Sequence, residues 1–329
     1  MNKNEYLDKI SDEFMSILRK YIPNKMITGN GYIDMSFDAR LSKFNNSYSD
    51  SQYFYTGNKK FIHWTTIQNL MSVINYREIR LYNLHNSSDA NEFNYAAENL
   101  KLPKESIDCA KDFLYTFSFC KSSELDNPYL WQEYGKNYEG VALEFEVVNN
   151  PKEWKNFMLS PIFYEIPKNL KNLVDELEKF KLKHPNASTD IDLGKLIAFH
   201  KKPDFSKELE IRLSTYYPFE KEEEYDTFCN TEFRFEEKRP RVTDYFGLKL
   251  WVDNNSSWVK NEDIDLDRSQ RVNDKYFIEK PKIKITNIYF GKNCGINNKV
   301  FIHFRQKLEY ITKIKLGYEI DDLVLNLYG

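Results

Sequence analysis

The segment Phe61–Asn83 (FIHWTTIQNLMSVINYREIRLYN) constrains the fold more than any other part of this chain. Its apolar and aromatic residues predict a short strand over Lys60–Trp64 and a second one over Glu78–Tyr82. Between the two strands, apolar residues recur at the spacing of one helix face: Ile67, Leu70, Met71 and Ile74. The segment therefore predicts a strand–helix–strand unit.

Polar residues mark the ends of these elements. Thr65 or Thr66 can accept hydrogen bonds from the unpaired N–H groups of the helix, and Asn75 tolerates the left-handed conformation that ends a helix. His63 is expected at the C-terminal end of the first strand, where α/β folds often place ligand-binding groups. It can act as a general base, as a ligand for a ribose hydroxyl or as a buried core histidine, and the sequence leaves these three roles open.

A charged cluster occurs late in the chain, where Glu208, Glu210 and Arg212 alternate within Lys207–Thr215 (KELEIRLST). In a strand these three residues lie on one face. Three charges on one face cannot be buried without partners, so this face is either a solvated edge or a functional site. Arg212 can pair with either carboxylate, and a carboxylate held in this way can stabilise a developing cation or accept a hydroxyl proton.

Three aromatic side chains are candidates for stacking on a planar ligand ring. Trp131 and Tyr134 lie three residues apart in a short helix predicted over Asp126–Tyr138, so they share one face. Trp64 follows His63 directly. The alternative is that these residues pack in the core, as we expect for most aromatic residues of a chain that is 16% aromatic.

The remaining pattern predicts an α+β fold with mixed, largely antiparallel sheets and flanking helices. Amphipathic helices are predicted over Glu5–Tyr21 and Leu170–Leu182, and the alternating segments predict three strands over residues 113–120, 140–147 and 284–291. Residues 1–58 are interpreted as an N-terminal helix followed by a polar connection or lid over 24–58. Residues 59–329 are interpreted as one α+β domain with an insertion around 219–281.

Composition and cysteine spacing argue against several classes of protein. A net charge of -3 gives no general attraction to nucleic acid or anionic membranes. The four cysteines show no CxxC or Cys/His ligand spacing, so no metal site is predicted. The N-terminus lacks an apolar signal region, and no stretch approaches the roughly 20 apolar residues of a spanning helix. We therefore predict a cytoplasmic protein with no membrane contact.

Five segments resemble, in this order, the uncharacterised bacterial family DUF2971. They are FIHWTT, NSSDANEF, TFSFC, LWQEYGKNYEGVALEF and ELEIRL. The chain departs from the family pattern at Ser88-Asp89, where Asn-Asp is usual, and in the unusually long stretch after Phe219. The family resembles in turn the ADP-ribosyltransferase fold, through its histidine strand, helix, second strand and late glutamate strand. This implies an ADP-ribosyltransferase-like core.

The resemblance also implies roles for individual residues. His63 would hold the ribose of NAD, Trp64 or Tyr134 would stack on nicotinamide, Arg80 would meet phosphate, and Glu210 or Glu208 would be catalytic together with His63. Thr65, Trp131 and Arg212 complete the implied NAD-binding set.

The implied activity is that of an NAD-dependent ADP-ribosyltransferase or NAD glycohydrolase of a bacterial toxin or phage-defence type. Its partners would be NAD as substrate, an unidentified protein or nucleic-acid acceptor, and an antitoxin or defence-system protein. The alternative is a non-catalytic sensor module that binds a nucleotide or a partner in a defence system.

Overall fold

The structure, a computed structural model, describes residues 3–84, 92–102, 104–191, 193–216, 229–236, 239–251, 274–295, 302–303, 306–308 and 310. Helices occur together with strands that pair mostly antiparallel, so the fold is α+β, as the sequence predicts. Residues 86–91 of the segment NSSDANEF and part of the expected insertion around 219–281 lie outside these ranges. Within them, none of the helices combines the length and apolar character needed to span a bilayer.

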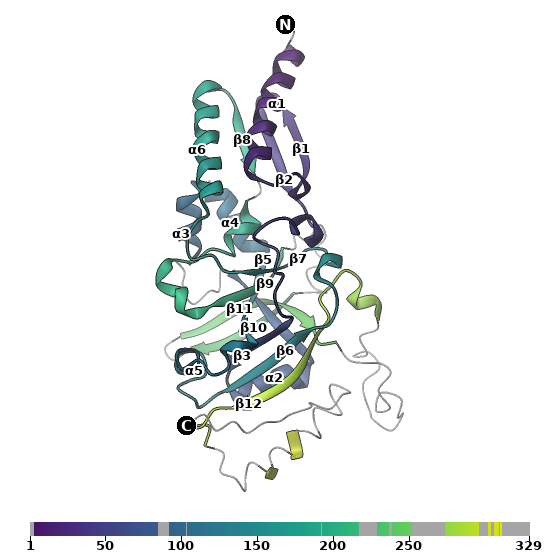
Figure 1. Cartoon of the computed structure of the whole chain (residues 1–329), viewed down its shortest axis with the longest axis vertical. Helices are drawn as coiled ribbons and strands as arrows, with labels where there is room; N and C mark the ends of the chain where they lie inside the picture. The colour runs from purple at the N-terminus through teal and green to yellow at the C-terminus, as the bar shows by residue number, and fades with distance from the viewer. Residues whose placement is uncertain are drawn as a thin grey trace.

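The larger sheet has nine strands among the described residues (Figure 1). Their order is β10-β11-β4-β5-β3-β6-β12, and β9 pairs with both β5 and β7. The strands are β3 (Lys60–Thr65), β4 (Glu78–Asn83), β5 (Leu114–Lys121), β6 (Val141–Val147), β7 (Phe157–Pro161), β9 (Glu210–Tyr216), β10 (Cys229–Glu236), β11 (Arg239–Lys249) and β12 (Ile283–Phe290). The strands predicted over 113–120, 140–147 and 284–291 are thus confirmed as β5, β6 and β12.

The N-terminal layer combines a small sheet with two long helices. The sheet consists of β1 (Ile27–Ile33), β2 (Ser36–Leu41) and β8 (Ser188–Ile191), of which β2 and β8 run parallel. Helices α1 (Lys3–Tyr21) and α6 (Lys168–Lys183) confirm the two predicted amphipathic helices and pack against each other beside this sheet (Figure 1).

The interpretation of residues 24–58 as a polar connection or lid is wrong for residues 27–41, which form the β1–β2 hairpin. Phe37, Ala39 and Leu41 of β2 alternate into the core. This short pattern becomes a strand because β2 pairs with β8, which lies far along the chain, and because α1 and α6 cover its apolar face. The boundary placed near residue 58 stays a prediction.

The strand–helix–strand unit forms as predicted, with α2 (Ile67–Tyr76) between β3 and β4. Thr66 caps the helix, because its Oγ1 accepts a hydrogen bond from the backbone N of Asn69 at 3.1 Å. Asn75 does not end the helix; Arg77 does, with a left-handed φ of 52°. Since β3 and β4 both pair antiparallel with β5, they run parallel to each other and α2 is their crossover.

Shorter helices complete the described part of the chain. They are α3 (Glu92–Asn99), α4 (Lys104–Phe113), α5 (Pro128–Glu133) and α7 (Gly194–Ile197), together with the 3-10 helices η1 (Asn24–Met26), η2 (Asn45–Tyr48), η4 (Ser122–Glu124), η5 (Pro151–Glu153), η6 (Pro203–Glu208) and η8 (Asp274–Phe277). The helix predicted over Asp126–Tyr138 is therefore shorter than expected. Pro128 occupies its first turn, where proline needs no N–H partner.

Candidate functional site

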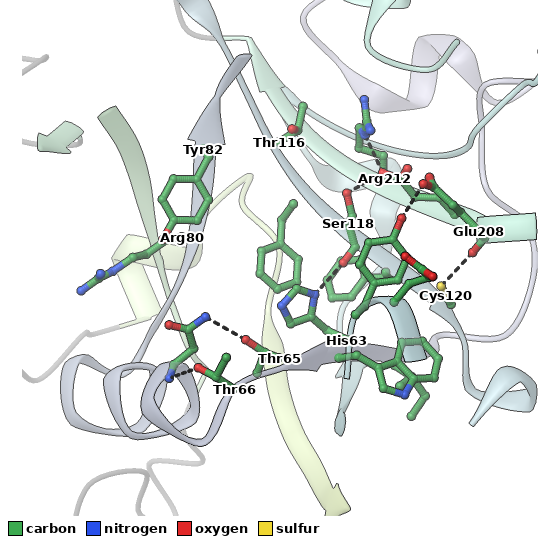
Figure 2. A pocket seen from close by; sticks show the side chains of 18 of the residues that line it. His63, Thr65, Thr66, Arg80, Tyr82, Thr116, Ser118, Cys120, Glu208 and Arg212 are labelled. Atoms are coloured by element: carbon green, nitrogen blue, oxygen red, sulfur yellow. Dashed lines mark hydrogen bonds and ion pairs between the residues drawn. The ribbon is translucent and has the colours of Figure 1, made fainter. Parts of the chain in front are cut away.

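The candidate site lies where the large sheet divides. On one edge, β5 pairs with β9 along residues 114–120. On the other edge, β5 pairs with β4 only through residues 115–116 and with β3 only through residues 120–121. Among the described residues, no strand pairs with residues 117–119 on this edge. A cavity of about 590 Å³, lined by β3, β4, β5 and the start of α2, opens at this fork (Figure 2).

His63 lies within β3, in the middle of the strand rather than at its end as expected. Its Nδ1 is 2.9 Å from the carbonyl oxygen of Ser118. Because a carbonyl only accepts, Nδ1 carries a hydrogen, and a neutral ring then keeps a lone pair on Nε2. Burial lowers the pKa of His63 to about 4, so the ring is neutral at pH 7. Nε2 is turned away from Ser118 in Figure 2 and serves as a fixed acceptor.

Ser118 connects His63 to the carboxylate of Glu210. Ser118 Oγ donates to Glu210 Oε1, and Arg212, which is opposite Ser118 in the strand register, donates to the same oxygen from Nε at 2.7 Å. Lys201 Nζ lies 2.6 Å from Glu210 Oε2. Burial alone would raise the pKa of Glu210, but the charges of Arg212 and Lys201 hold it well below its ordinary value. Glu210 is therefore a buried, ionised carboxylate with both oxygens bonded.

The prediction that Glu208 shares a strand with Glu210 is wrong. Glu208 ends η6, β9 begins at Glu210, and Leu209 between them has a left-handed φ of 50°, which breaks the alternation of a strand. The side chain of Glu208 still joins the same group. Its Oε2 is 2.7 Å from Lys201 Nζ, and its Oε1 accepts a hydrogen bond from the hydroxyl of Tyr134.

The β4 side of the cavity presents Arg80 and Tyr82, across His63 from Glu208 in Figure 2. Arg80 Nε is 3.5 Å from Glu78 Oε1, and the guanidinium lies over the ring of Tyr245, 4.6 Å from its centroid. An arginine held by a carboxylate and an aromatic ring keeps its positive charge at a fixed position on this wall of the cavity, which suits an anionic ligand group. The cavity thus has polar groups on both sides of His63.

Most residues predicted for the site line this one cavity: His63, Trp64, Thr65, Arg80, Tyr134, Glu208, Glu210 and Arg212. Trp131 is not among the lining side chains, and its predicted ligand contact is wrong. It is fully buried, and its Nε1 donates to the carbonyl oxygen of Leu125 at 2.7 Å, because α5 turns this face towards the core. Trp64 lines the cavity but is only 5% exposed.

Sequence reasoning missed Ser118 and Lys201, which connect the predicted groups. Ser118 carries a weak signal, as a polar residue between two phenylalanines in a strand expected to be buried. Lys201 lies outside the helices and strands, between α7 and η6, and no periodic pattern indicates that its ammonium reaches both glutamates.

Comparisons with known proteins give one match. No curated protein and no solved structure shows a significant similarity to the chain. The match is to the sequence model of a family described as "Protein of unknown function (DUF2971)". The matched residues include Tyr134, Lys201, Glu208, Glu210 and Arg212. Over residues 130–213 the chain therefore matches the family DUF2971. This match supports the resemblance to DUF2971 that was identified from the sequence.

Proposed function

We propose that this cavity binds NAD and that the protein transfers the ADP-ribose group of NAD to an acceptor or to water. One observation carries the proposal: Ser118 ties the neutral imidazole of His63 to the ionised carboxylate of Glu210 within a single cavity. The volume of about 590 Å³ falls within the roughly 300–1,000 Å³ of small-molecule sites. The cavity thus offers a hydrogen-bond acceptor and a negative charge at fixed positions.

The arrangement of polar groups suits the parts of NAD. Nε2 of His63 can accept a hydrogen bond from a ribose hydroxyl. On the β4 side, the positive charge of Arg80 suits the pyrophosphate, which is negatively charged. On the other side, Tyr134 is 44% exposed, so its ring can stack on nicotinamide.

The reaction would break the bond between C1′ of the ribose and the nicotinamide nitrogen. Both bonding electrons leave with nicotinamide, which becomes neutral, and the ribose becomes an oxocarbenium ion. The carboxylates of Glu208 and Glu210 supply negative charge near this cation. A lone pair of the acceptor then forms the new bond to C1′, and the acceptor proton passes to Glu208 or to water.

Non-catalytic binding of a nucleotide or a partner is the second candidate, and the charge balance of the site favours it. Glu208 and Glu210 carry two negative charges, and Lys201 and Arg212 carry two positive charges at 2.6–2.7 Å from them. A cluster that is neutral as a whole exerts a weaker field on a cation than a lone carboxylate does. Such a cluster would hold a ligand without favouring departure of nicotinamide.

Nicotinamide release from NAD by the purified full chain, with and without cell extract as acceptor, tests the proposal. We expect release by the wild type and a loss of about a hundredfold in His63→Gln and Glu208→Gln, the order of magnitude for removing one preorganised polar group. Glu146→Gln is the matched control, because Glu146 lies on β6 and does not line the cavity.

Two other results would assign the site differently. Thermal stabilisation by NAD without any nicotinamide release would favour the binding module, since a ligand that binds only the folded state raises its stability. If NAD neither stabilises the protein nor releases nicotinamide, both candidates are contradicted. The toxin or phage-defence role, the protein or nucleic-acid acceptor and an antitoxin or defence-system partner stay predictions of the family resemblance.

A further inference from the structure

The two glutamates of the site differ in how many side-chain partners their carboxylate oxygens already have. Glu210 accepts from three side chains, namely Ser118, Arg212 and Lys201. Glu208 has two side-chain partners among the described residues, Lys201 and Tyr134. Since an ionised carboxylate offers about four acceptor positions, Glu208 keeps more of its capacity for a ligand.

The partner of Glu208 Oε1 is a side chain that a ligand can reach. Tyr134 follows α5, lines the cavity and is 44% exposed, whereas Glu208 is 7% exposed. Its hydroxyl therefore reaches from the accessible side of the cavity to a buried carboxylate. Lys201, the other partner, is 9% exposed and also binds Glu210, so it is held from two sides.

The backbone after Tyr134 is firmly held. The three residues Lys136, Asn137 and Tyr138 all have left-handed φ values, of 47°, 53° and 67°. This conformation costs roughly 1–2 kcal/mol per residue without glycine and persists only where the surroundings enforce it. Asn293 supplies such support, because its backbone N donates to the carbonyl oxygen of Tyr138 at 2.9 Å. Movement of Tyr134 would therefore be rotation of its side chain.

We propose that Glu208 is the carboxylate that contacts the ligand, and that the Tyr134 hydroxyl occupies the place of a ligand hydroxyl, which displaces it on binding. Glu210 is a positioning residue, which orients Lys201 and Ser118 through its ion pair and hydrogen bond. The inference rests on the proposed function for the class of ligand, a ribosyl compound with free hydroxyl groups.

The proposal predicts opposite effects of two substitutions on ligand binding. Tyr134→Phe keeps the ring but removes the competing hydroxyl, so the ligand no longer has to break a hydrogen bond. One such bond corresponds to roughly a fivefold tighter Kd. Glu208→Gln keeps the shape but replaces one acceptor oxygen by a donor, so binding should weaken by about tenfold or more.

Isothermal titration of ADP-ribose into the full chain and its variants is the test. We expect tighter binding in Tyr134→Phe, weaker binding in Glu208→Gln, and no gain from Tyr134→Phe when both substitutions are combined. Tyr129→Phe is the matched control, because Tyr129 lies on α5, the helix that Tyr134 follows, is half-buried and does not line the cavity. Its Kd should equal that of the wild type.

An unchanged Kd in both Tyr134→Phe and Glu208→Gln, weaker binding in Tyr134→Phe, or no binding of ADP-ribose by the wild type would overturn the inference. Nicotinamide release is measured on the same preparations. Binding with the expected pattern but without nicotinamide release would contradict the proposed transfer reaction and leave the roles of Tyr134 and Glu208 supported.

Discussion

His200 is buried and His63 is half-buried at the wall of the cavity, and desolvation lowers the pKa of each from 6.5 to about 4. In the unfolded chain both rings titrate near 6.5. Between pH 6.5 and pH 4 the unfolded state therefore binds protons that the folded state does not. The free energy of unfolding should fall as the pH decreases through this window, and the contribution of these rings should level off below pH 4.

His63→Gln should remove the contribution of His63 to this pH dependence of the unfolding free energy and leave the contribution of His200. Between pH 7 and pH 5, a pKa lowered to about 4 corresponds to about 2 kcal/mol of unfolding free energy per histidine. Urea denaturation at the two pH values measures this difference. The variant should lose about 2 kcal/mol less than the wild type, while His303→Gln, at an exposed position, should follow the wild type. An equal loss in all three proteins would show that folding does not lower the pKa of His63.

Among the elements, those fixed by neighbouring residues were predictable from sequence. The β3–α2–β4 unit has its apolar stripe and its Thr66 cap within one segment, so local spacing was sufficient. The β1–β2 hairpin was not predictable, because its buried face depends on β8 and on two helices distant in sequence. The start of β9 was misplaced because the left-handed residue Leu209 is not a glycine or asparagine, so its sequence gives no turn signal.

The candidate site also contains residues that could be predicted from the sequence and residues that could not. His63, Glu210 and Arg212 stand out as charged or titratable residues in apolar strands, and the structure places all three in one cavity. The parts that join them were not predictable. Ser118 gains its role from the antiparallel register of β5 and β9, and Lys201 gains its role from a loop that returns towards β9, neither of which a local pattern specifies.

The junction of β3 and β6 gives a prediction about these elements. Gly140 precedes β6, and a Cβ at this position would lie 2.3 Å from the carbonyl oxygen of Thr65. A backbone carbonyl cannot move away from the new Cβ as a flexible side chain could. Gly140→Ala should therefore force β3 and β6 apart and lower the free energy of unfolding by about 2 kcal/mol. Urea denaturation measures the effect.

Gly29→Ala in β1 is the control for this substitution, because a Cβ there has no atom within 4 Å. It should be neutral or raise the free energy of unfolding by up to about 1 kcal/mol. Equal stability of the two variants would show that β3 and β6 do not approach each other as closely as described. Because Thr65 lines the cavity, Gly140→Ala should also weaken ligand binding.

In the whole molecule, the N-terminal layer and the large sheet share a continuous apolar contact. The core cluster that contains Phe14 and Phe37 extends to Leu84, Leu114 and Met158, which lie in or next to β4, β5 and β7. Backbone hydrogen bonds also join the segment that follows β2 to the segment that precedes β7, for example from Asn45 N to the carbonyl oxygen of Trp154 at 3.0 Å. We therefore expect the two parts to unfold together, although the sequence suggested a boundary near residue 58.

Phe14→Ala tests this coupling. Phe14 is 1% exposed, and its ring centroid lies 6.0 Å from that of Phe37 in β2 and 5.9 Å from that of Phe180 in α6. Its truncation should cost about 3–5 kcal/mol through lost burial and the cavity left behind. Tyr6→Ala, at a position on the same helix that is 42% exposed, is the control and should cost far less.

The distribution of tryptophan makes the readout selective. Of the five tryptophans, those at positions 64, 131, 154 and 251 lie outside the helices and strands of the N-terminal layer, and Trp258 lies outside the described residues. The fluorescence of these four therefore reports on the large sheet and the segments beside it. Far-ultraviolet circular dichroism reports on the whole chain. If the molecule unfolds as one unit, Phe14→Ala shifts both urea transitions by the same free energy. If the fluorescence transition stays at the wild-type position while the dichroism signal becomes biphasic, the N-terminal layer, with α6 and β8 included, unfolds separately from the large sheet.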